Sequence, residues 1–315
     1  MNQSLAFVFP GQGSQSLGML ADLASNNRII GDTFKEASDA LGYDLWALCQ
    51  AGPEADLNRT DRTQPAILTA SIALWRLWCE QSRVRPAFVA GHSLGEYSAL
   101  VASGVIDFPD AVRLVERRGQ LMQQAVPEGE GAMAAILGLD DQQIVDVCAQ
   151  AAQGEVVNAV NYNAPGQVVI AGKASAVERA IEGCKAAGAK RAIGLPVSVP
   201  SHCALMKPAA EQLARDLGDL VWNEPSSTLV QNVNAAPADD LAGLRTLLVQ
   251  QLYSPVRWVQ SVAFMANQGV TDIVECGPGK VLSGLNKRCV KTLGTYNLDS
   301  VDGFAATRDR FAEGV

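Results

Sequence analysis

The stretch Ala87-Phe88-Val89-Ala90-Gly91-His92-Ser93-Leu94-Gly95 decides how this chain of 315 residues folds. Its first four residues form a short apolar run that predicts a buried strand, and a helix is expected to follow, through residue 100. Between them, residues 91–95 fit the Gly-x-Ser-x-Gly pattern, whose small residues permit a sharp turn from strand to helix. Such a turn raises the serine hydroxyl above the sheet, where the next backbone N–H and the helix N-terminus can stabilise an oxyanion. The pattern predicts Ser93 as a nucleophile, and a tight structural turn is the alternative.

The chain contains only two histidines, His92 and His202, to act as a base for such a serine. The side chain of His92 should leave the sharp turn in another direction than the Ser93 hydroxyl, so a packing role is expected for it. His202 is therefore the candidate base by elimination, and a hydrogen-bonded histidine at a domain junction is the alternative. Two histidines also nearly exclude a metal site built from two or three imidazoles.

Strands that alternate with helices predict a parallel sheet covered on both faces. The apolar run Leu5-Ala6-Phe7-Val8-Phe9, stopped by Pro10-Gly11, has the composition of a buried parallel strand. Further strands are expected at 228–233 and 271–275. Helices are expected at 63–80, 109–125, 209–217, 241–252, 256–267 and from residue 281 onward.

The middle of the chain has a different order of elements. Strands are expected at 132–137, 156–161, 167–171 and 191–197, and helices at 140–152 and 175–187. The order strand-helix-strand-strand-helix-strand is the ferredoxin-like pattern. We therefore expect an α/β protein in which residues 129–198 form a small ferredoxin-like subdomain, inserted into a large subdomain made of residues 1–128 and 199–315. The last dozen residues are poorly patterned, and we expect them to be frayed.

Composition excludes several classes of function. The 25 Lys and Arg residues against 33 Asp and Glu give a net charge of −8, so the chain lacks the cationic surplus that nucleic acids or anionic membranes select for. No stretch approaches the roughly 18 apolar residues of a membrane-spanning helix, and no signal peptide is recognised. The seven cysteines are scattered without a Cys-x-x-Cys pair, which favours reduced thiols. We expect a soluble globular protein in the cytoplasm.

A glycine-rich loop, Pro10-Gly11-Gln12-Gly13-Ser14-Gln15-Ser16-Leu17-Gly18, follows the first expected strand. It is not a dinucleotide fingerprint, because Ser16 occupies the place of the third glycine, nor a Walker loop, because Met19 stands where lysine is required. Such a loop beside the serine turn can offer a backbone N–H as a second oxyanion donor. A plain turn explains its composition equally well.

Arg118 lies on the apolar stripe of the expected helix at 109–125, whereas Arg117 lies toward the polar side. The stripe consists of Ala111, Leu114, Val115, Leu121, Met122 and Ala125. An inward guanidinium must be paired, because an unpaired charge in a core costs several kcal/mol. The sequence leaves two readings level: a structural bridge to a core carboxylate, or a bidentate clamp for a substrate carboxylate.

Six motifs, in order along essentially the whole chain, resemble those of bacterial malonyl-CoA:acyl-carrier-protein transacylases. They are Phe9-Pro10-Gly11-Gln12-Gly13-Ser14-Gln15, Thr63-Gln64-Pro65-Ala66, Gly91-His92-Ser93-Leu94-Gly95-Glu96-Tyr97, Asn163-Ala164-Pro165-Gly166-Gln167, Pro200-Ser201-His202 and Gly277-Pro278-Gly279. The resemblance implies a hydrolase-like large α/β subdomain beside the ferredoxin-like one. It also implies transfer of a malonyl group from malonyl-CoA to the phosphopantetheine thiol of acyl carrier protein, through a malonyl-serine intermediate, for fatty acid biosynthesis.

The same resemblance assigns roles to individual residues. Ser93 would be the nucleophile and His202 the base, with the main-chain carbonyl of Gln251 orienting the imidazole. The backbone amides of Gln12 and Leu94 would form the oxyanion hole.

Substrate-binding roles are also carried over by this resemblance. Arg118 would hold the malonyl carboxylate, and Gln12, Asn163 and Arg191 match further substrate-binding positions, the last two on the coenzyme A side. The adjacent Arg117 departs from the expectation of one inward arginine.

Two alternatives to acyl transfer stay open at this stage. A serine hydrolase would have an acidic third member, for which the chain order offers Asp107, Asp110, Asp140, Asp141 and Asp146. A carrier-protein-binding module with a decayed site is the non-enzymatic reading, against which the complete set of Ser93, His202 and Arg118 argues.

The expected partners are acyl carrier protein and malonyl-CoA or CoA, with no nucleic acid and no membrane, and the chain is expected to be a monomer. No metal or redox cofactor is implied. Carrier proteins are typically acidic, so a local basic surface is needed. The candidates are Lys280, Lys287, Arg288 and Lys291, for which a solvated helix face is an equal reading.

Overall fold

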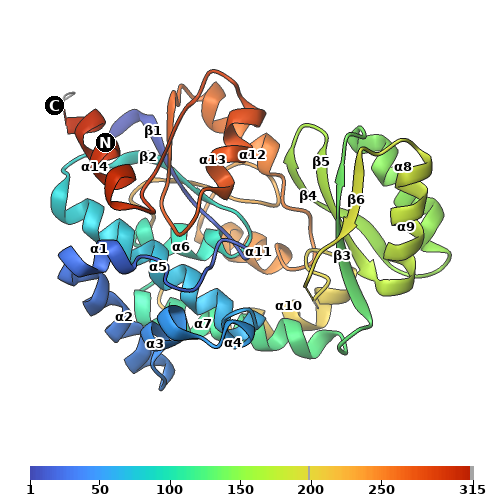
Figure 1. Cartoon of the computed structure of the whole chain (residues 1–315), viewed down its shortest axis with the longest axis horizontal. Coiled ribbons are helices and arrows are strands. Elements are labelled where there is room, and N and C mark those ends of the chain that lie inside the picture. The colour runs from blue at the N-terminus through green and yellow to red at the C-terminus, as the bar shows by residue number, and fades with distance from the viewer. Residues whose placement is uncertain (198, 313–315) are drawn as a thin grey trace.

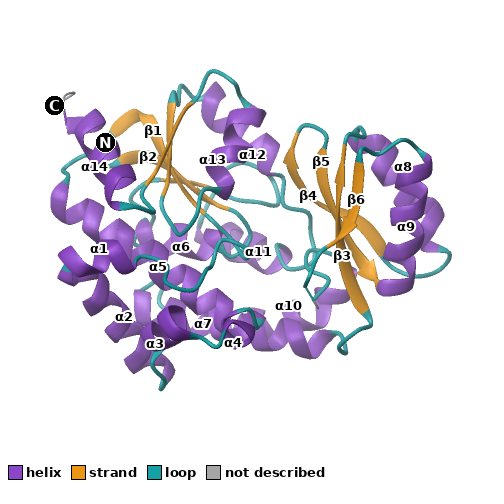
Figure 2. Ribbon diagram, viewed as in Figure 1, coloured by secondary structure: helices purple, strands orange, loops and turns teal. Residues whose placement is uncertain are grey.

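Five parallel strands form the larger of two sheets in the computed structural model, which describes residues 1–197 and 199–312 (Figure 1). Their order is β7-β2-β1-β8-β9, so the first strand of the chain lies in the centre. The strands are β1 (Asn2–Phe9), β2 (Pro86–Gly91), β7 (Thr228–Val230), β8 (Asp272–Glu275) and β9 (Gly294–Asn297). Figure 2 shows them in orange, surrounded by helices. The expected parallel sheet is confirmed.

Both faces of this sheet are buried, as the apolar run in β1 predicts. Leu5, Phe7 and Phe9 alternate with Ala6 and Val8 and contribute to two separate apolar clusters. The first cluster includes helices α2 (Arg28–Leu41), α5 (Thr60–Gln81), α7 (Phe108–Ala125) and α10 (Lys207–Gly218). The second includes α12 (Trp258–Asn267) and α13 (Val281–Cys289).

A four-stranded antiparallel sheet forms the second unit. Its order is β4-β5-β3-β6, which corresponds to the 2-3-1-4 arrangement of the ferredoxin-like pattern. The strands are β3 (Gly131–Leu137), β4 (Val157–Ala164), β5 (Gln167–Lys173) and β6 (Arg191–Gly194). Helices α8 (Asp141–Ala152) and α9 (Ala174–Ala186) cover the face that points away from the large sheet (Figure 1). The expected ferredoxin-like order is therefore confirmed.

Several expected elements are shorter than the sequence suggests. The strand expected at 191–197 ends at Gly194, and the strand expected at 228–233 ends at Val230. The helix expected to begin at residue 256 begins at Trp258, because Val256 forms a parallel bridge with Asn161 of the small sheet. Backbone hydrogen bonds at this bridge connect the two units. Val256 therefore pairs with the small sheet, although its local sequence favours a helix.

The expectation of a frayed C-terminus is wrong for the described residues. Helix α14 (Val301–Ala312) packs Phe304 and Phe311 against Trp78, with ring centroids 6.2 and 6.4 Å apart. Only two aromatic residues anchor this helix, which explains why its apolar pattern is weak. Residues 313–315 lie outside the described part of the chain, as does residue 198 at the expected end of the small subdomain.

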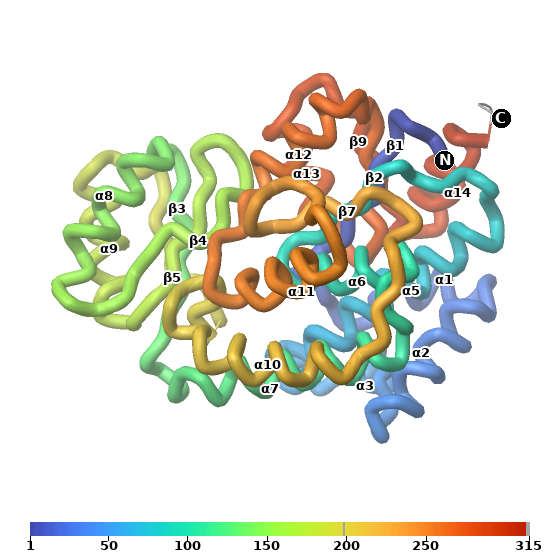
Figure 3. The backbone as a smooth tube through the Cα atoms, turned by 180° about the vertical axis from the view of Figure 1, so that it is seen from behind, coloured from blue at the N-terminus to red at the C-terminus, as the bar shows by residue number. Residues whose placement is uncertain are grey.

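Among the described residues, six further helices complete the large unit. They are α1 (Ala21–Asn26), α3 (Leu45–Ala51), α4 (Glu54–Leu57), α6 (Gly95–Ala102), the 3-10 helix η1 (Ala204–Met206) and α11 (Leu241–Gln250). Seen from behind, α10 and α7 run side by side below α11 (Figure 3). None of the helices described here is long and apolar enough to cross a membrane.

Candidate active site

The turn from β2 into α6 has the strained geometry expected of a nucleophile elbow. Ser93 adopts a φ of +51°, a left-handed conformation that is unusual for a residue with a side chain. A Cβ at Gly91 would lie 1.8 Å from the carbonyl carbon of Gly95, and one at Gly95 would lie 2.0 Å from the carbonyl oxygen of Phe9. Only glycine fits at both positions, so the pattern seen in the sequence has a steric cause.

Ser93 and His202 form the expected pair. The Ser93 hydroxyl lies 2.8 Å from Nε2 of His202, and Nδ1 of His202 lies 2.7 Å from the main-chain oxygen of Gln251. A carbonyl oxygen only accepts hydrogen bonds, so Nδ1 carries the proton and Nε2 is free to accept the hydroxyl proton. Burial, and the positive charge of Arg118, lower the pKa of His202 to about 3. The imidazole is therefore neutral at physiological pH and able to act as a base.

The hydrogen-bond partner of His202 Nδ1 shows whether the site contains the acidic third member of a hydrolase triad. It is the Gln251 carbonyl, as the family resemblance implies, and not a carboxylate. Two of the five aspartates considered have other roles: Asp140 caps the N-terminus of α8, and Asp110 pairs with Arg113 on the surface. The acidic-triad alternative is wrong.

Arg118 points inward from α7, as the apolar stripe predicts, and is 1% exposed. Its Nη1 donates to Gln64 Oε1 at 2.7 Å, and its Nη2 donates to Gln251 Oε1 at 3.0 Å and to the Ser93 hydroxyl at 3.4 Å. Within residues 1–197 and 199–312, no carboxylate forms an ion pair with it, so the alternative of a bridge to a core carboxylate does not hold. Arg117 lies outside and pairs with Asp216 at 3.4 Å.

A cavity of about 120 Å³, lined in part by Ser93 and His202, lies between the two units. It is lined by Gln12, Thr60, His92, Ser93, Met122, Met133, Asn161, Leu195, Val197, Val199, Ser201 and His202. Met133 and Asn161 belong to β3 and β4 of the small sheet, whereas Ser93 belongs to the large one. The site therefore depends on both units, and its small volume suits a short acyl group.

The loop after β1 lies against the serine turn, because the two strands pair in parallel register with Phe9 opposite Gly91. The backbone N–H of His92 donates to the Phe9 oxygen at 3.0 Å. This pairing puts Gln12 into the lining of the Ser93 cavity. Its side chain donates to Thr60 at 3.3 Å. The oxyanion roles of the Gln12 and Leu94 amides stay predictions.

The expected coenzyme A residues do not line this cavity. Asn163 is turned to His92, with its Oδ1 2.7 Å from Nε2 of that ring. Arg191 is exposed at the start of β6. His92 packs against Trp258, with ring centroids 5.6 Å apart, as its expected packing role requires. Its bond to Asn163 adds a contact between the units that the sequence did not predict.

Three further polar residues complete the site. Gln64, Glu96 and Asn232 are all buried. Gln64 bonds to Arg118, Asn232 bonds to the serine turn, and Glu96 bonds to Asn232 and Gln251. Polar residues inside otherwise buried segments were the available signal: Gln64 interrupts the buried helix α5, and Glu96 follows the elbow directly. Asn232 gave no local signal, because it approaches the elbow only through the pairing of β7 with β2.

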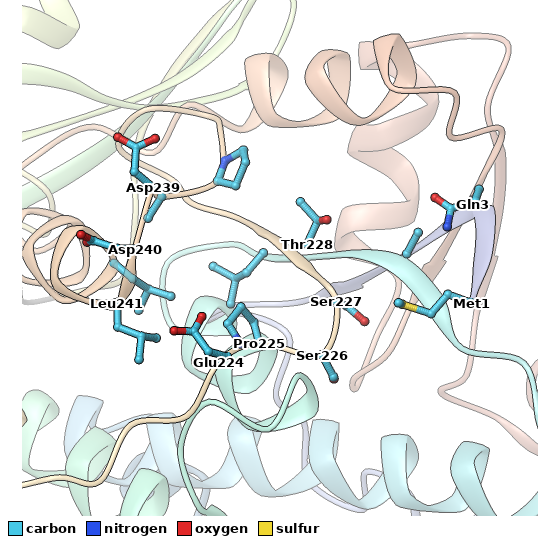
Figure 4. Close-up of a pocket in the computed structure, with 15 residues that line it drawn as sticks. Met1, Gln3, Glu224, Pro225, Ser226, Ser227, Thr228, Asp239, Asp240 and Leu241 are labelled. Atoms are coloured by element: carbon cyan, nitrogen blue, oxygen red, sulfur yellow. The ribbon is translucent and has the colours of Figure 1, made fainter.

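A larger cavity of about 490 Å³ lies near the edge strand β7 (Figure 4). None of the site residues described so far lines it. Met1, Gln3, Ala87 and Thr228, at the amino-terminal ends of three strands, contribute to its lining together with Glu224, Asp239 and Asp240. Ligand sites of parallel sheets lie at the carboxyl ends of the strands, where Ser93 is found. This geometry favours the smaller cavity, which is lined by both Ser93 and His202, as the candidate site. Among the described residues, no group of three or more His, Cys, Asp or Glu could hold a metal ion.

The basic residues near the Gly277-Pro278-Gly279 turn differ in what they contact. Lys280 lies 3.6 Å from Asp299, and Arg288 bonds to the Gln167 side chain and the Pro165 oxygen at the turn between β4 and β5. Lys287 and Lys291 are exposed. Two of the four side chains thus have structural partners on the protein.

Comparisons with known proteins identify the family of the chain. The acyl transferase domain family matches residues 6–302. The chain is 62% identical over 288 residues to the malonyl CoA-acyl carrier protein transacylase of Salmonella typhimurium, which covers 91% of this chain and 93% of the relative. An acyl carrier protein S-malonyltransferase from Vibrio cholerae superimposes with a TM-score of 0.94 at 59% identity, covering 96% of this chain and 99% of that one. A malonyl-transacylase solved in complex with its type II PKS acyl-carrier protein gives a TM-score of 0.96 at 56% identity, with 98% and 99% covered.

Proposed function

The chain belongs to the malonyl-CoA–acyl carrier protein transacylases of the acyl transferase family, and from this premise we propose that Ser93 carries the malonyl group between the two substrates. The enzyme transfers malonyl from malonyl-CoA to acyl carrier protein and so supplies fatty acid synthesis. The observation that carries the assignment is one cluster: the Ser93 hydroxyl lies 2.8 Å from the His202 base and 3.4 Å from the Arg118 guanidinium.

Acylation begins with proton transfer from Ser93 to Nε2 of His202 while the serine oxygen attacks the thioester carbonyl. The backbone amides of Gln12 and Leu94 stabilise the negative oxygen of the tetrahedral intermediate. The carbon–sulfur bond then breaks, and the imidazolium returns its proton to the sulfur of coenzyme A. Malonyl-serine and free coenzyme A result. The Gln251 carbonyl holds the imidazolium in place while it carries the extra proton.

Transfer to the carrier reverses these roles. The phosphopantetheine thiol gives its proton to His202, and its sulfur attacks the malonyl-serine ester. The ester carbon–oxygen bond breaks, and Ser93 regains the proton. The two half-reactions share one site, which is the arrangement behind ping-pong kinetics.

Arg118 supplies the selectivity for malonyl. Its guanidinium is buried within reach of the serine oxygen, and the described residues offer it amide and hydroxyl acceptors but no ionic partner. The free carboxylate of a malonyl group bound to Ser93 would supply the missing charge in a bidentate pair. Gln12, Asn163 and Arg191 are proposed to bind the rest of the substrate, the last two on the coenzyme A side.

Acyl carrier protein is the partner, and Lys280, Lys287, Arg288 and Lys291 are proposed as its docking surface. The exposed Lys287 and Lys291 are available for pairing with an acidic carrier. We also propose a cytoplasmic monomer that binds neither nucleic acid nor membrane. All seven cysteines are free thiols, which supports a reducing compartment. The reaction needs no further cofactor, because the thioester of malonyl-CoA is already activated.

We further propose the division of the chain into a large unit, 1–128 and 199–315, and a small unit, 129–198. Two sheets that share no strand support this division, although residues 198 and 313–315 lie outside the described residues. Because each unit contributes to the Ser93 cavity, the substrate lies between them.

Mass spectrometry of the intact protein after incubation with malonyl-CoA tests the proposal. We expect a malonyl adduct on Ser93 that acyl carrier protein discharges much faster than water does, and no adduct in Ser93→Ala. His202→Ala should slow formation of the adduct by a factor on the order of 10²–10⁴, the usual loss when a general base is removed. An adduct on another residue, or hydrolysis as fast as transfer, would contradict the proposal.

A further inference from the structure

Glu96 is a buried carboxylate three residues after the nucleophile, in the first turn of α6. It is 1% exposed, and within the described residues no Lys, Arg or His side chain forms an ion pair with it. Instead its oxygens accept hydrogen bonds from the Asn232 backbone N–H at 2.9 Å, Gln251 Nε2 at 3.2 Å and Gln231 Nε2 at 3.4 Å. Burying a carboxylate without an ionic partner costs free energy, so a buried glutamate beside the elbow suggests a functional role.

One of these donors braces the serine turn from both sides. The Asn232 side chain donates from Nδ2 to the Gly91 oxygen at 2.6 Å and accepts at Oδ1 from the Ser93 backbone N–H at 2.8 Å. These two bonds lie on either side of His92, and the second holds the backbone N–H of Ser93, the residue whose φ is +51°. Glu96 fixes the backbone of Asn232 and therefore the position of this brace.

The second donor connects to the base and to the proposed carboxylate clamp. Gln251 Nε2 donates to the Glu96 carboxylate and also to the main-chain oxygen of Ser93 at 2.9 Å. The side-chain oxygen Oε1 of Gln251 accepts a hydrogen bond from Arg118. The main-chain oxygen of Gln251 holds His202. An ionised carboxylate only accepts hydrogen bonds, so Glu96 selects the amide orientation in which Oε1 faces Arg118. The flipped amide would place an NH₂ group against the guanidinium.

We propose that Glu96 is a positioning residue for malonyl transfer: through Asn232 and Gln251 it holds Ser93, His202 and Arg118 in one geometry. The proposal rests on the roles proposed for those three residues above. It adds that Glu96, by orienting the Gln251 amide, also fixes the hydrogen-bond acceptor that faces Arg118. Glu96 therefore affects which acyl group is accepted as well as how fast it reacts.

Two effects of opposite sign act on the ionisation of Glu96. Burial raises the pKa of Glu96 to about 7, and the bonds from Asn232, Gln251 and Gln231, with the charge of Arg118, oppose that rise. All three hydrogen-bonding partners are donors. They therefore favour the ionised form that orients Gln251.

Glu96→Gln is the discriminating variant, because it keeps the size of the side chain but can present a donor to Gln251. We expect kcat/KM with malonyl-CoA to fall on the order of 10- to 100-fold, with a smaller loss for acetyl-CoA, which has no carboxylate for Arg118 to hold. Ser98→Ala is the matched control. Ser98 is fully buried in the same helix, its hydroxyl has no hydrogen-bond partner among the described residues, and its loss should change both rates less than twofold.

A loss equal for the two thioesters, or one no larger than that of Ser98→Ala, would overturn the proposal for Glu96. It would leave the roles of Ser93 and His202 standing, because the labelling experiment tests those separately. Should Glu96→Gln fail to fold, Glu96→Asp keeps the charge and provides a second test in a double-mutant cycle with Asn232→Ala. Non-additive effects on the malonyl rate are expected for residues that act as one unit, and additive effects would refute the proposal.

Discussion

At the scale of single residues, the contacts of Arg118 support the carboxylate-binding role proposed for it. It is held by two glutamine oxygens, Gln64 from α5 and Gln251 after α11, and it reaches the Ser93 hydroxyl. Neutral acceptors orient the guanidinium without cancelling its charge. The charge is therefore available to a substrate carboxylate.

Replacing Arg118 by alanine separates these functions. We expect kcat/KM for malonyl-CoA to fall by roughly two or three powers of ten, because a charge-assisted bidentate pair in a pocket is lost. The rate with acetyl-CoA should change little. Arg118→Lys should rescue only in part, since a point charge lacks the planar fork. Equal losses for both thioesters together with a large drop in Tm would show a structural role instead.

Glu96 gives a second prediction at this scale, through the pH dependence of stability. Its pKa is raised from 4.5 to about 7 in the folded protein, so its carboxyl stabilises the fold below pH 4.5, and this contribution is lost as the pH rises to about 7. The loss is about 3 kcal/mol for this shift. Glu96→Gln does not titrate, so its stability relative to the wild type should rise by about that amount from pH 4.5 to pH 8. Urea unfolding of both proteins at the two pH values measures it, and an unchanged difference would contradict it.

Sequence reasoning found the residues whose chemistry is distinctive and missed those that act through position. Ser93 is marked by its glycines, His202 by the scarcity of histidine, and Arg118 by its place on an apolar stripe. Asn232 has no such mark. It reaches the elbow because β7 pairs with β2, a contact between residues 139 positions apart for the bond to Ser93. A local sequence pattern does not predict contacts between residues so far apart in the chain.

At the scale of elements, sequence periodicity identified the elements with long buried runs and missed the helices between residues 21 and 57 and the last helix. Helix α5 is buried along most of its length and was expected within a few residues of its ends. Helices α1, α2, α3 and α4 and the strand β9 were not expected, and α14 was taken for a frayed end. The buried residues of α14 are Phe304, Thr307 and Phe311, and Trp78, which both phenylalanines contact, is more than two hundred positions earlier.

The contribution of α14 to stability can be measured directly. Phe304 is 3% exposed, and Phe304→Ala should lower the free energy of unfolding by roughly 3 kcal/mol or more, as large-to-small core changes do. Malonyl transfer at 25 °C should stay close to normal, because the described contacts of this helix do not reach the Ser93 cavity. Val301→Ala, at a side chain on the same helix that is 44% exposed, is the control and should change stability little. Denaturant titration decides, and equal effects of the two changes would refute the anchoring role.

At the scale of the whole molecule, the arrangement of two units puts the carrier surface and the acyl site on different segments. Helix α13 carries Lys287 on the large unit, and its Arg288 reaches the small unit at Gln167. The proposed docking surface therefore lies beside a junction of the units. Binding of the carrier and loading of Ser93 should be separable by mutation.

Charge reversal at Lys287 and Lys291 tests this separation. The double change Lys287→Glu and Lys291→Glu should leave acylation of Ser93 by malonyl-CoA nearly unchanged but raise KM for acyl carrier protein by about tenfold, with a weaker dependence on salt. Lys35→Glu on α2, which is exposed and pairs with Asp39, is the control. If transfer to the carrier is unaffected by the double change, the docking surface lies elsewhere.

The strand order of the large sheet has a consequence for synthesis of the chain. β1 is made first, yet one of its two neighbours is β8, which is complete only at residue 275. While the ribosome translates the residues between, one edge of an apolar strand remains without its partner. The small antiparallel sheet uses only strands from residues 131–194 and can close during that interval. A nascent chain arrested before residue 272 should therefore present an unpaired β1 edge, which makes it a target for chaperones and for aggregation until residues 272–275 emerge.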